Sequence, residues 1–195
     1  CSNGQYQDDT VAAAHSCKTC PAGQFAIDTE TACAVCSAGT YQQSDPAPDY
    51  SCVLCIRGTF IDDDGGDASL HDEMDDCIVC AEGQISLAEG AAACTSCPTG
   101  QYLIDTATNA TLHDDLSDCL NCSAGTEYVD TQTACDTCES GKYQEQSGIA
   151  SLQCKSCGVG QYAINKTTAC EACSTGQYQD DAVAAEHSCK KCGAG

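Results

Sequence analysis

The chain has 195 residues, with 21 cysteines, 29 acidic and 7 basic residues, and a formal charge of -22. A cysteine share of about 11% is typical of disulfide scaffolds, and the absence of Trp together with scattered aliphatic residues excludes a conventional globular core or a membrane span. A chain this acidic repels phosphate backbones and anionic lipid surfaces, which excludes nucleic acid as the partner and membrane insertion of this segment.

The cysteines define a repeat, because after Cys1 they come in ten C-x2-C pairs. Counting each module from the second cysteine of a pair gives ten modules of 16 to 25 residues and the start of an eleventh. We number these modules 1 to 11. They span residues 1–19, 20–35, 36–54, 55–79, 80–96, 97–121, 122–137, 138–156, 157–172, 173–191 and 192–195.

Each module opens with C-x2-G, and an aromatic residue usually follows two positions after the glycine. Ile85 takes the aromatic place in module 5, and Tyr128 lies one position late in module 7. Glycine suits a tight turn with positive φ, and the aromatic ring can cover the adjacent disulfide in a module with no other core. The short polar remainder predicts paired short strands and loops. The aromatic residues are Tyr6, Phe25, Tyr41, Phe60, Tyr102, Tyr143, Tyr162 and Tyr178.

Longer copies show that the array grew by duplication. The two 25-residue modules share the similar segments 69–72 and 111–114, and residues 1–20 match residues 173–192 at 16 of 20 positions. We therefore expect the parent protein to continue in both directions, with any secretion signal upstream of this segment. The Ala-rich stretches 11–15 and 183–187 are long enough for one helical turn, which is too short to be stable alone.

Three roles compete for the cysteines: disulfides, zinc sites and redox-active C-x2-C motifs. The spacing of the pairs overlaps that of zinc ribbons, but four-thiolate sites would leave one cysteine over and would not explain the glycine–aromatic rule. A redox C-x2-C needs a helix N-terminus in a βαβ unit, which does not fit in modules this short. The sequence favours disulfides, with zinc as the alternative.

Two disulfide pairings are open. In the rival scheme neighbouring pairs join first to first and second to second, as Cys17 with Cys33 and Cys20 with Cys36. The module unit instead suggests closure between its opening cysteine and the first cysteine of the next pair, each loop contributing about 3 kcal/mol by the chain-entropy model. Module closure predicts Cys1–Cys17, Cys20–Cys33, Cys36–Cys52, Cys55–Cys77, Cys80–Cys94, Cys97–Cys119, Cys122–Cys135, Cys138–Cys154, Cys157–Cys170 and Cys173–Cys189, with Cys192 unpaired.

The pattern C-x2-C-x2-G-x-Y, followed by 8 to 18 residues and another C-x2-C, resembles the ephrin-receptor-like cysteine-rich repeat. That repeat is a relative of the small modules of tumour-necrosis-factor receptors and of EGF-like domains, and the resemblance covers the whole chain. It implies small disulfide-rich β modules in tandem, arranged as an elongated rod or solenoid-like array with little regular secondary structure. The family occurs in receptors, adhesins and giant secreted proteins.

Three N-x-S/T sequons, at Asn109, Asn121 and Asn165, predict N-glycosylation if the chain is secreted. The many Ser and Thr residues offer further positions for O-linked sugar. A glycan coat would shield modules that have little core of their own.

Acidic clusters offer oxygen ligands for Ca²⁺, with Asp62, Asp64 and Asp67 as the candidates, although the EF-hand spacing is not met. The alternative is a solvated acidic surface that keeps molecules apart. The histidines form two repeated pairs, His15 with His187 and His71 with His113, so they follow duplication rather than a convergent catalytic site.

An array of like modules produces length, stiffness and a repeating surface. The sequence therefore favours a structural subunit of an extracellular filament, surface appendage or matrix fibre, which self-associates or joins related repeat proteins. We expect no catalysis and no cofactor other than calcium. The alternatives are the stalk or ligand-binding ectodomain of a receptor or adhesin, and a cytosolic zinc-binding thiolate array.

Overall fold

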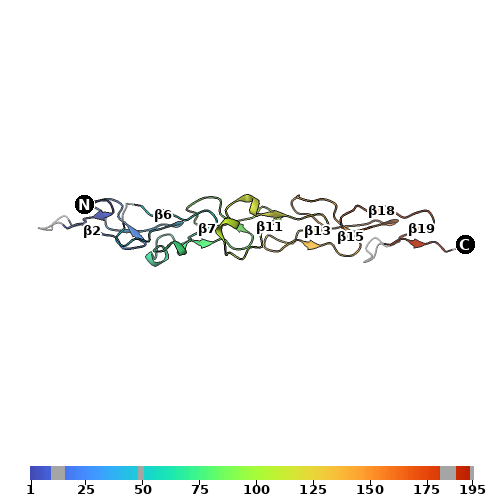
Figure 1. Cartoon of the computed structure of the whole chain (residues 1–195), viewed down its shortest axis with the longest axis horizontal. Helices are drawn as coiled ribbons and strands as arrows, with labels where there is room; N and C mark the ends of the chain where they lie inside the picture. Colours follow the sequence, from blue (N-terminus) through green and yellow to red (C-terminus); the bar gives the residue numbers. More distant parts are fainter. Residues whose placement is uncertain (10–15, 48–50, 181–187, 194–195) are drawn as a thin grey trace. The chain divides into compact units, whose positions relative to one another are not determined.

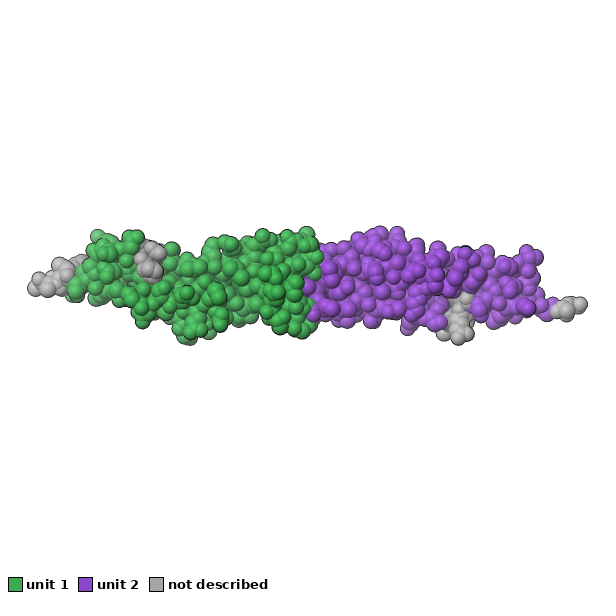
Figure 2. Space-filling view, in the orientation of Figure 1, with its two compact units in different colours: residues 1–96, 105–118 green, residues 97–104, 119–195 purple. Residues whose placement is uncertain are grey.

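The computed structural model describes residues 1–9, 16–47, 51–180 and 188–193, and it forms ten two-stranded antiparallel sheets in tandem (Figure 1). The chain divides into two compact units, Cys1–Ser96 with Asp105–Asp118 and Cys97–Ile104 with Cys119–Gly195 (Figure 2). The predicted fold class of small disulfide-rich β modules in tandem is confirmed. The Ala-rich stretches 11–15 and 183–187, with the two histidines in them, lie outside the described residues.

The first unit contains five hairpins, each made of two strands of two residues. Two pairs of one-turn 3-10 helices lie in its long loops: η1 (Ala68–Leu70) with η2 (Met74–Asp76), and η3 (Ala110–Leu112) with η4 (Leu116–Asp118). The hairpins are β1 (Gln5–Tyr6) with β2 (Lys18–Thr19), β3 (Gln24–Phe25) with β4 (Ala34–Val35), β5 (Thr40–Tyr41) with β6 (Val53–Leu54), β7 (Thr59–Phe60) with β8 (Ile78–Val79), and β9 (Gln84–Ile85) with β10 (Thr95–Ser96).

The second unit contains the other five hairpins, built in the same way. They are β11 (Gln101–Tyr102) with β12 (Leu120–Asn121), β13 (Thr126–Glu127) with β14 (Asp136–Thr137), β15 (Lys142–Tyr143) with β16 (Lys155–Ser156), β17 (Gln161–Tyr162) with β18 (Glu171–Ala172), and β19 (Gln177–Tyr178) with β20 (Lys190–Lys191).

A tight turn leads into each hairpin, and its chemistry explains the C-x2-G rule. In module 3 the N–H of Thr40 donates to the carbonyl of Ser37 at 3.0 Å, and Gly39 between them has φ of 73°. This is the type II arrangement, which needs positive φ at its third residue and therefore glycine. The equivalent glycines of modules 1 to 10 all have positive φ, as predicted.

Ten disulfides close the modules, and they are those of the module-closing scheme. They run from Cys1–Cys17 to Cys173–Cys189, with Cα atoms 5.4 to 5.9 Å apart, an ordinary separation for a disulfide. Cys17 bridges Cys1 rather than Cys33, so the rival pairing is not the one formed. Cys192 is free and exposed.

The opening half-cystines form a large part of the core, which also contains Ile61, Ile85, Leu103 and Leu152. The opening cysteines of modules 2 to 9, from Cys20 to Cys157, are 0 to 4% exposed. At the first junction Cys20 forms a buried cluster with Ala26 and Ala47, and Tyr6 packs against this cluster. Of the other pattern aromatics, Phe25, Tyr41, Phe60, Tyr102, Tyr143 and Tyr162 are half-buried and Tyr178 is exposed, and their predicted role as covers for the disulfides stays a prediction.

Three 19-residue modules add a charged side chain across the hairpin. Lys18 on β2 lies over the ring of Tyr6, 5.7 Å from its centre, and makes a hydrogen bond to Asp8. This contact lowers the pKa of Asp8 and raises the pKa of Lys18. The same trio recurs as Tyr143, Lys155 and Glu145, and as Tyr178, Lys190 and Asp180. Such exposed contacts are individually weak, so they assist hairpins that the disulfides already hold.

The turn glycines also allow close backbone approach between modules two apart. A Cβ added to Gly58 would lie 2.0 Å from the carbonyl oxygen of Ala110, and one added to Gly39 would lie 2.1 Å from that of Gly90. At Gly176, in the same turn position, none of the described residues has an atom within 4 Å of an added Cβ. The array thus offers a matched pair of sites that differ in crowding and share the same backbone conformation.

We predict that Gly58→Ala destabilises the chain far more than Gly176→Ala. The second substitution should cost only the strain of positive φ, about 1 to 2 kcal/mol, whereas the first must also displace backbone and should cost at least about 3 kcal/mol. Chemical denaturation followed by circular dichroism measures both. Equal losses would show that modules two apart do not pack as described.

Candidate functional site

The structural feature that repeats along the chain is the junction between modules, and the turn glycine is its centre. Within the first unit the N–H of Gly39 donates to the carbonyl of Ile61 at 2.9 Å, and its carbonyl accepts from the N–H of Cys55 at 2.9 Å. Both partners belong to the next module. The same two bonds join Gly23 to Gln42 and Cys36, Gly58 to Ser86 and Cys80, Gly125 to Gln144 and Cys138, and Gly160 to Gln179 and Cys173.

The residue after the aromatic links three modules through its backbone. The carbonyl of Gln42 accepts from Gly23 in module 2, and its N–H donates to the carbonyl of His71 in module 4 at 2.8 Å. Ser86 does the same between modules 4 and 6, and Gln144 does so between modules 7 and 9. These three residues are 2 to 4% exposed. Because backbone atoms make the bonds, the position accepts unlike side chains.

Where this residue is glutamine, its side chain also makes hydrogen bonds to the loop of its own module. The Nε2 of Gln144 donates to the carbonyl of Gln153 at 2.7 Å, and its Oε1 accepts from the N–H of Gln146 at 2.9 Å. Gln42 makes similar bonds with Ser44. The sequence analysis did not predict a role for these glutamines. The motif G-x-Y-Q, present in all four 19-residue modules, was a signal for them.

Each 25-residue module holds the preceding module with a buried histidine, an arrangement we call the histidine clasp. The ring of His71 is 0% exposed, with Nδ1 2.7 Å from the carbonyl oxygen of Thr40 and Nε2 3.0 Å from Oδ2 of Asp63. His113 repeats this geometry with Gln84 and Asp105, at 2.8 and 3.0 Å. In both clasps the aspartate lies eight residues before the histidine.

The clasp places the carboxylate of an aspartate beside a buried histidine ring. A backbone carbonyl only accepts hydrogen bonds, so Nδ1 of His71 donates to Thr40, and Nε2 faces the carboxylate of Asp63. The hydrogen bond with His71 has the largest effect in lowering the pKa of Asp63, and the hydrogen bond from the N–H of Asp67 has the next largest. Burial raises this pKa and so opposes them. His113 likewise lowers the pKa of Asp105.

The acidic loop of module 4 is organised around Asp63 and not around the calcium candidates. Asp63 accepts from the N–H groups of Gly65, Gly66 and Asp67 at 2.9 to 3.2 Å. Asp67 caps η1 by accepting from Ser69, while Asp62 and Asp64 are exposed. Over the described ranges, no three His, Cys, Asp or Glu side chains converge to hold a metal. Calcium binding at these residues stays a prediction.

The disulfides leave no set of thiolates for the zinc sites that the sequence offered as an alternative. Twenty of the 21 cysteines are in disulfides and so have no thiolate to offer a metal, and the remaining one, Cys192, is a single exposed thiol.

All three sequon asparagines are exposed, and two of them have a local structural role. Asn109 caps η3, its Oδ1 accepting from the N–H and hydroxyl of Thr111 at 3.1 and 2.9 Å. Asn109 in module 6 has the position that Asp67 has in module 4, the other 25-residue module. Asn165 makes the same bonds with Thr167. These bonds use Oδ1, whereas N-linked sugar attaches at Nδ2, so cap and glycan are compatible. Asn121 ends β12, and occupancy at all three remains a prediction.

Comparison with protein-family models and with curated proteins finds no match to this chain. Within the residues described, no helix combines the length and apolarity needed to cross a bilayer. The repeat itself shows what kind of chain this is. It is a tandem cysteine-rich array, and five of its junctions share one set of backbone hydrogen bonds.

We predict that acid weakens the histidine clasps. Asp63 and Asp105 have pKa values below the usual value near 3.8 in the folded chain, so there the folded state binds fewer protons than the unfolded state. Their contribution is therefore present above about pH 4 and is lost as pH falls through the folded pKa values. Asp63→Asn with Asp105→Asn should lower the melting temperature at pH 7 and flatten its fall between about pH 4 and pH 2.

Asp62→Asn is the control, since this exposed carboxylate neighbours the clasp. Thermal melts of the two variants across pH measure the difference. An unchanged acid profile in the double variant would show that the clasps contribute nothing to the junctions.

Proposed function

We propose that this chain is part of a structural subunit of an extracellular filament, cell-surface appendage or matrix fibre. The observation that supports it is the junction: at five junctions one disulfide-closed module binds the next through the same two backbone hydrogen bonds of the turn glycine. Stability then resides in modules and nearest-neighbour interfaces, so the chain can supply length without a central core. A catalytic role would need unlike groups brought together, whereas this array repeats like groups in sequence.

An oxidising, extracellular location fits the ten disulfides, because such bridges form and persist outside the reducing cytosol. The resemblance to ephrin-receptor-like and related receptor modules supports the same location. The exposed sequons at Asn109 and Asn165 supply acceptor sites for the secretory pathway. Copies of the chain or related repeat proteins are the proposed fibre partners.

The proposal is tested on native material isolated from the source. Electron microscopy should show filaments that contain this chain, and glycopeptide mapping should find sugar on Asn109 or Asn165, since both side chains are exposed. Dispersed molecules without filaments would contradict the fibre role. Bare asparagines at all three sequons would contradict the secretory location, so the two parts of the proposal fail separately.

A further inference from the structure

Modules 3 and 4 have large aliphatic residues at positions that are polar in most of the array. The two residues between the paired cysteines include a polar residue in seven of the ten pairs. The three apolar pairs are Ala34–Val35 on β4, Val53–Leu54 on β6 and Ile78–Val79 on β8. Val53, Leu54 and Ile78 are 50 to 55% exposed. Since seven hairpins form with a polar residue here, folding does not require these aliphatic side chains.

Ile56 departs in the same way. It directly follows the opening cysteine of module 4, and four other modules have serine at that position. Its side chain is 59% exposed. The turn beneath it is nevertheless well fixed, because Thr59 donates to the carbonyl of Ile56 from both its N–H and its hydroxyl. An exposed isoleucine is thus presented on a rigid turn.

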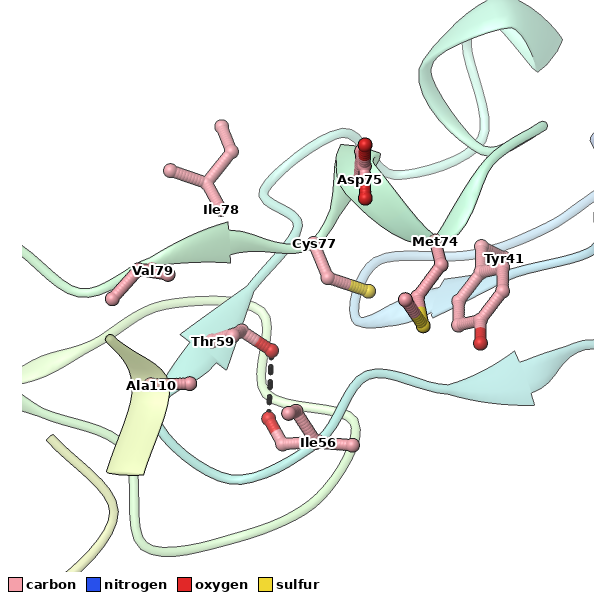
Figure 3. A pocket seen from close by; sticks show the side chains of 9 residues that line it. All are labelled: Tyr41, Ile56, Thr59, Met74, Asp75, Cys77, Ile78, Val79 and Ala110. Carbon is pink, nitrogen blue, oxygen red and sulfur yellow. Dashed lines mark hydrogen bonds between the residues drawn. The ribbon is translucent and has the colours of Figure 1, made fainter. Parts of the chain in front are cut away.

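Ile56, Ile78 and Val79 line a cavity of about 400 Å³ on the first unit, whereas Val53 and Leu54 lie outside it (Figure 3). Tyr41 of module 3, Met74 of η2 and Ala110 of η3 complete its apolar lining. Its walls are held in place by contacts already described: the His71 clasp binds Thr40 next to Tyr41, and Ala110 lies against Gly58. The volume is within the range of preformed ligand pockets and suits one or two large apolar side chains.

A second cavity of about 270 Å³ shares Asp75 and Ile78 with the first. Its lining adds Asp62, Asp63 and Asp76 to the apolar residues Ile61 and Leu70. An apolar chamber therefore adjoins an acidic one, and Asp75 stands at their common wall. We call the two chambers together the module 3–4 pocket.

We propose that the module 3–4 pocket binds a partner protein through an exposed segment that places an aliphatic or aromatic side chain beside a lysine or arginine. The apolar chamber would desolvate the first side chain, and the carboxylates of the second would attract the cation. A second copy of this chain is not the proposed occupant, because Asp62, Asp75 and Asp76 line the pocket and favour a basic segment, and only 7 residues of the chain are Lys or Arg. The inference goes beyond the proposed fibre role and does not depend on it.

The test uses the full chain labelled with ¹³C at isoleucine methyl groups and titrated with the peptide acetyl-Leu-Lys-Leu-Lys-Leu-amide. We expect saturable shifts of the Ile56 and Ile78 methyl signals, and weaker binding of acetyl-Leu-Glu-Leu-Glu-Leu-amide. Ile78→Thr, which copies Thr95 of module 5, and Ile56→Ser should each weaken binding about tenfold. Asp75→Ser, which copies Ser117 of module 6, should reduce the preference for the lysine peptide.

Leu120→Thr is the matched control, since Leu120 has the place of Ile78 in module 6 and lies outside the pocket. Binding that is lost in Ile78→Thr and kept in Leu120→Thr supports the proposal. It is overturned if the lysine peptide gives no saturable shifts, if the glutamate peptide binds as tightly, or if Leu120→Thr weakens binding equally. Methyl shifts that grow with protein concentration without peptide would assign the pocket to a second copy and also overturn it.

Discussion

Closure of each module by its own disulfide allows strands of only two residues to pair. A hairpin this short does not hold together in water, and modules of 16 to 25 residues bury too little surface to compensate. The bridge joins residues 13 to 22 positions apart and sets the two strands side by side. Only a closed module presents its glycine turn and opening cysteine to the next one, so the junctions depend on the bridges.

The sequence predicts those parts of the fold that a single residue type must supply. Cysteine spacing gives the modules, and the C-x2-G rule gives the turn, because only glycine adopts positive φ there without strain. The role of the position after the aromatic was not predicted, because its backbone makes the bonds. Gln42, Ser86 and Gln144 therefore share no common side chain that the sequence could reveal. The histidine clasp was read as mere duplication, although Asp63 and Asp105 stand at the same spacing before the two histidines.

Backbone junctions also explain why departures from the repeat are informative. A position that contributes only main-chain atoms tolerates many side chains, so its composition reflects solvent, neighbours and partners. Most modules place polar residues between their paired cysteines, whereas modules 3 and 4 place Val53, Leu54 and Ile78 there. The array can thus combine a uniform structural repeat with one surface that differs locally. This combination would serve a fibre that recruits a partner, and it would equally serve a ligand-binding ectodomain.

The central claim is that covalent closure, rather than a hydrophobic core, holds the fold together. It is tested most directly by calorimetry and circular dichroism on the full chain after complete reduction and alkylation, compared with the oxidised chain. The account predicts that the oxidised chain unfolds cooperatively and that the reduced chain shows no cooperative transition at any temperature. A reduced and alkylated chain that kept a cooperative transition would contradict it.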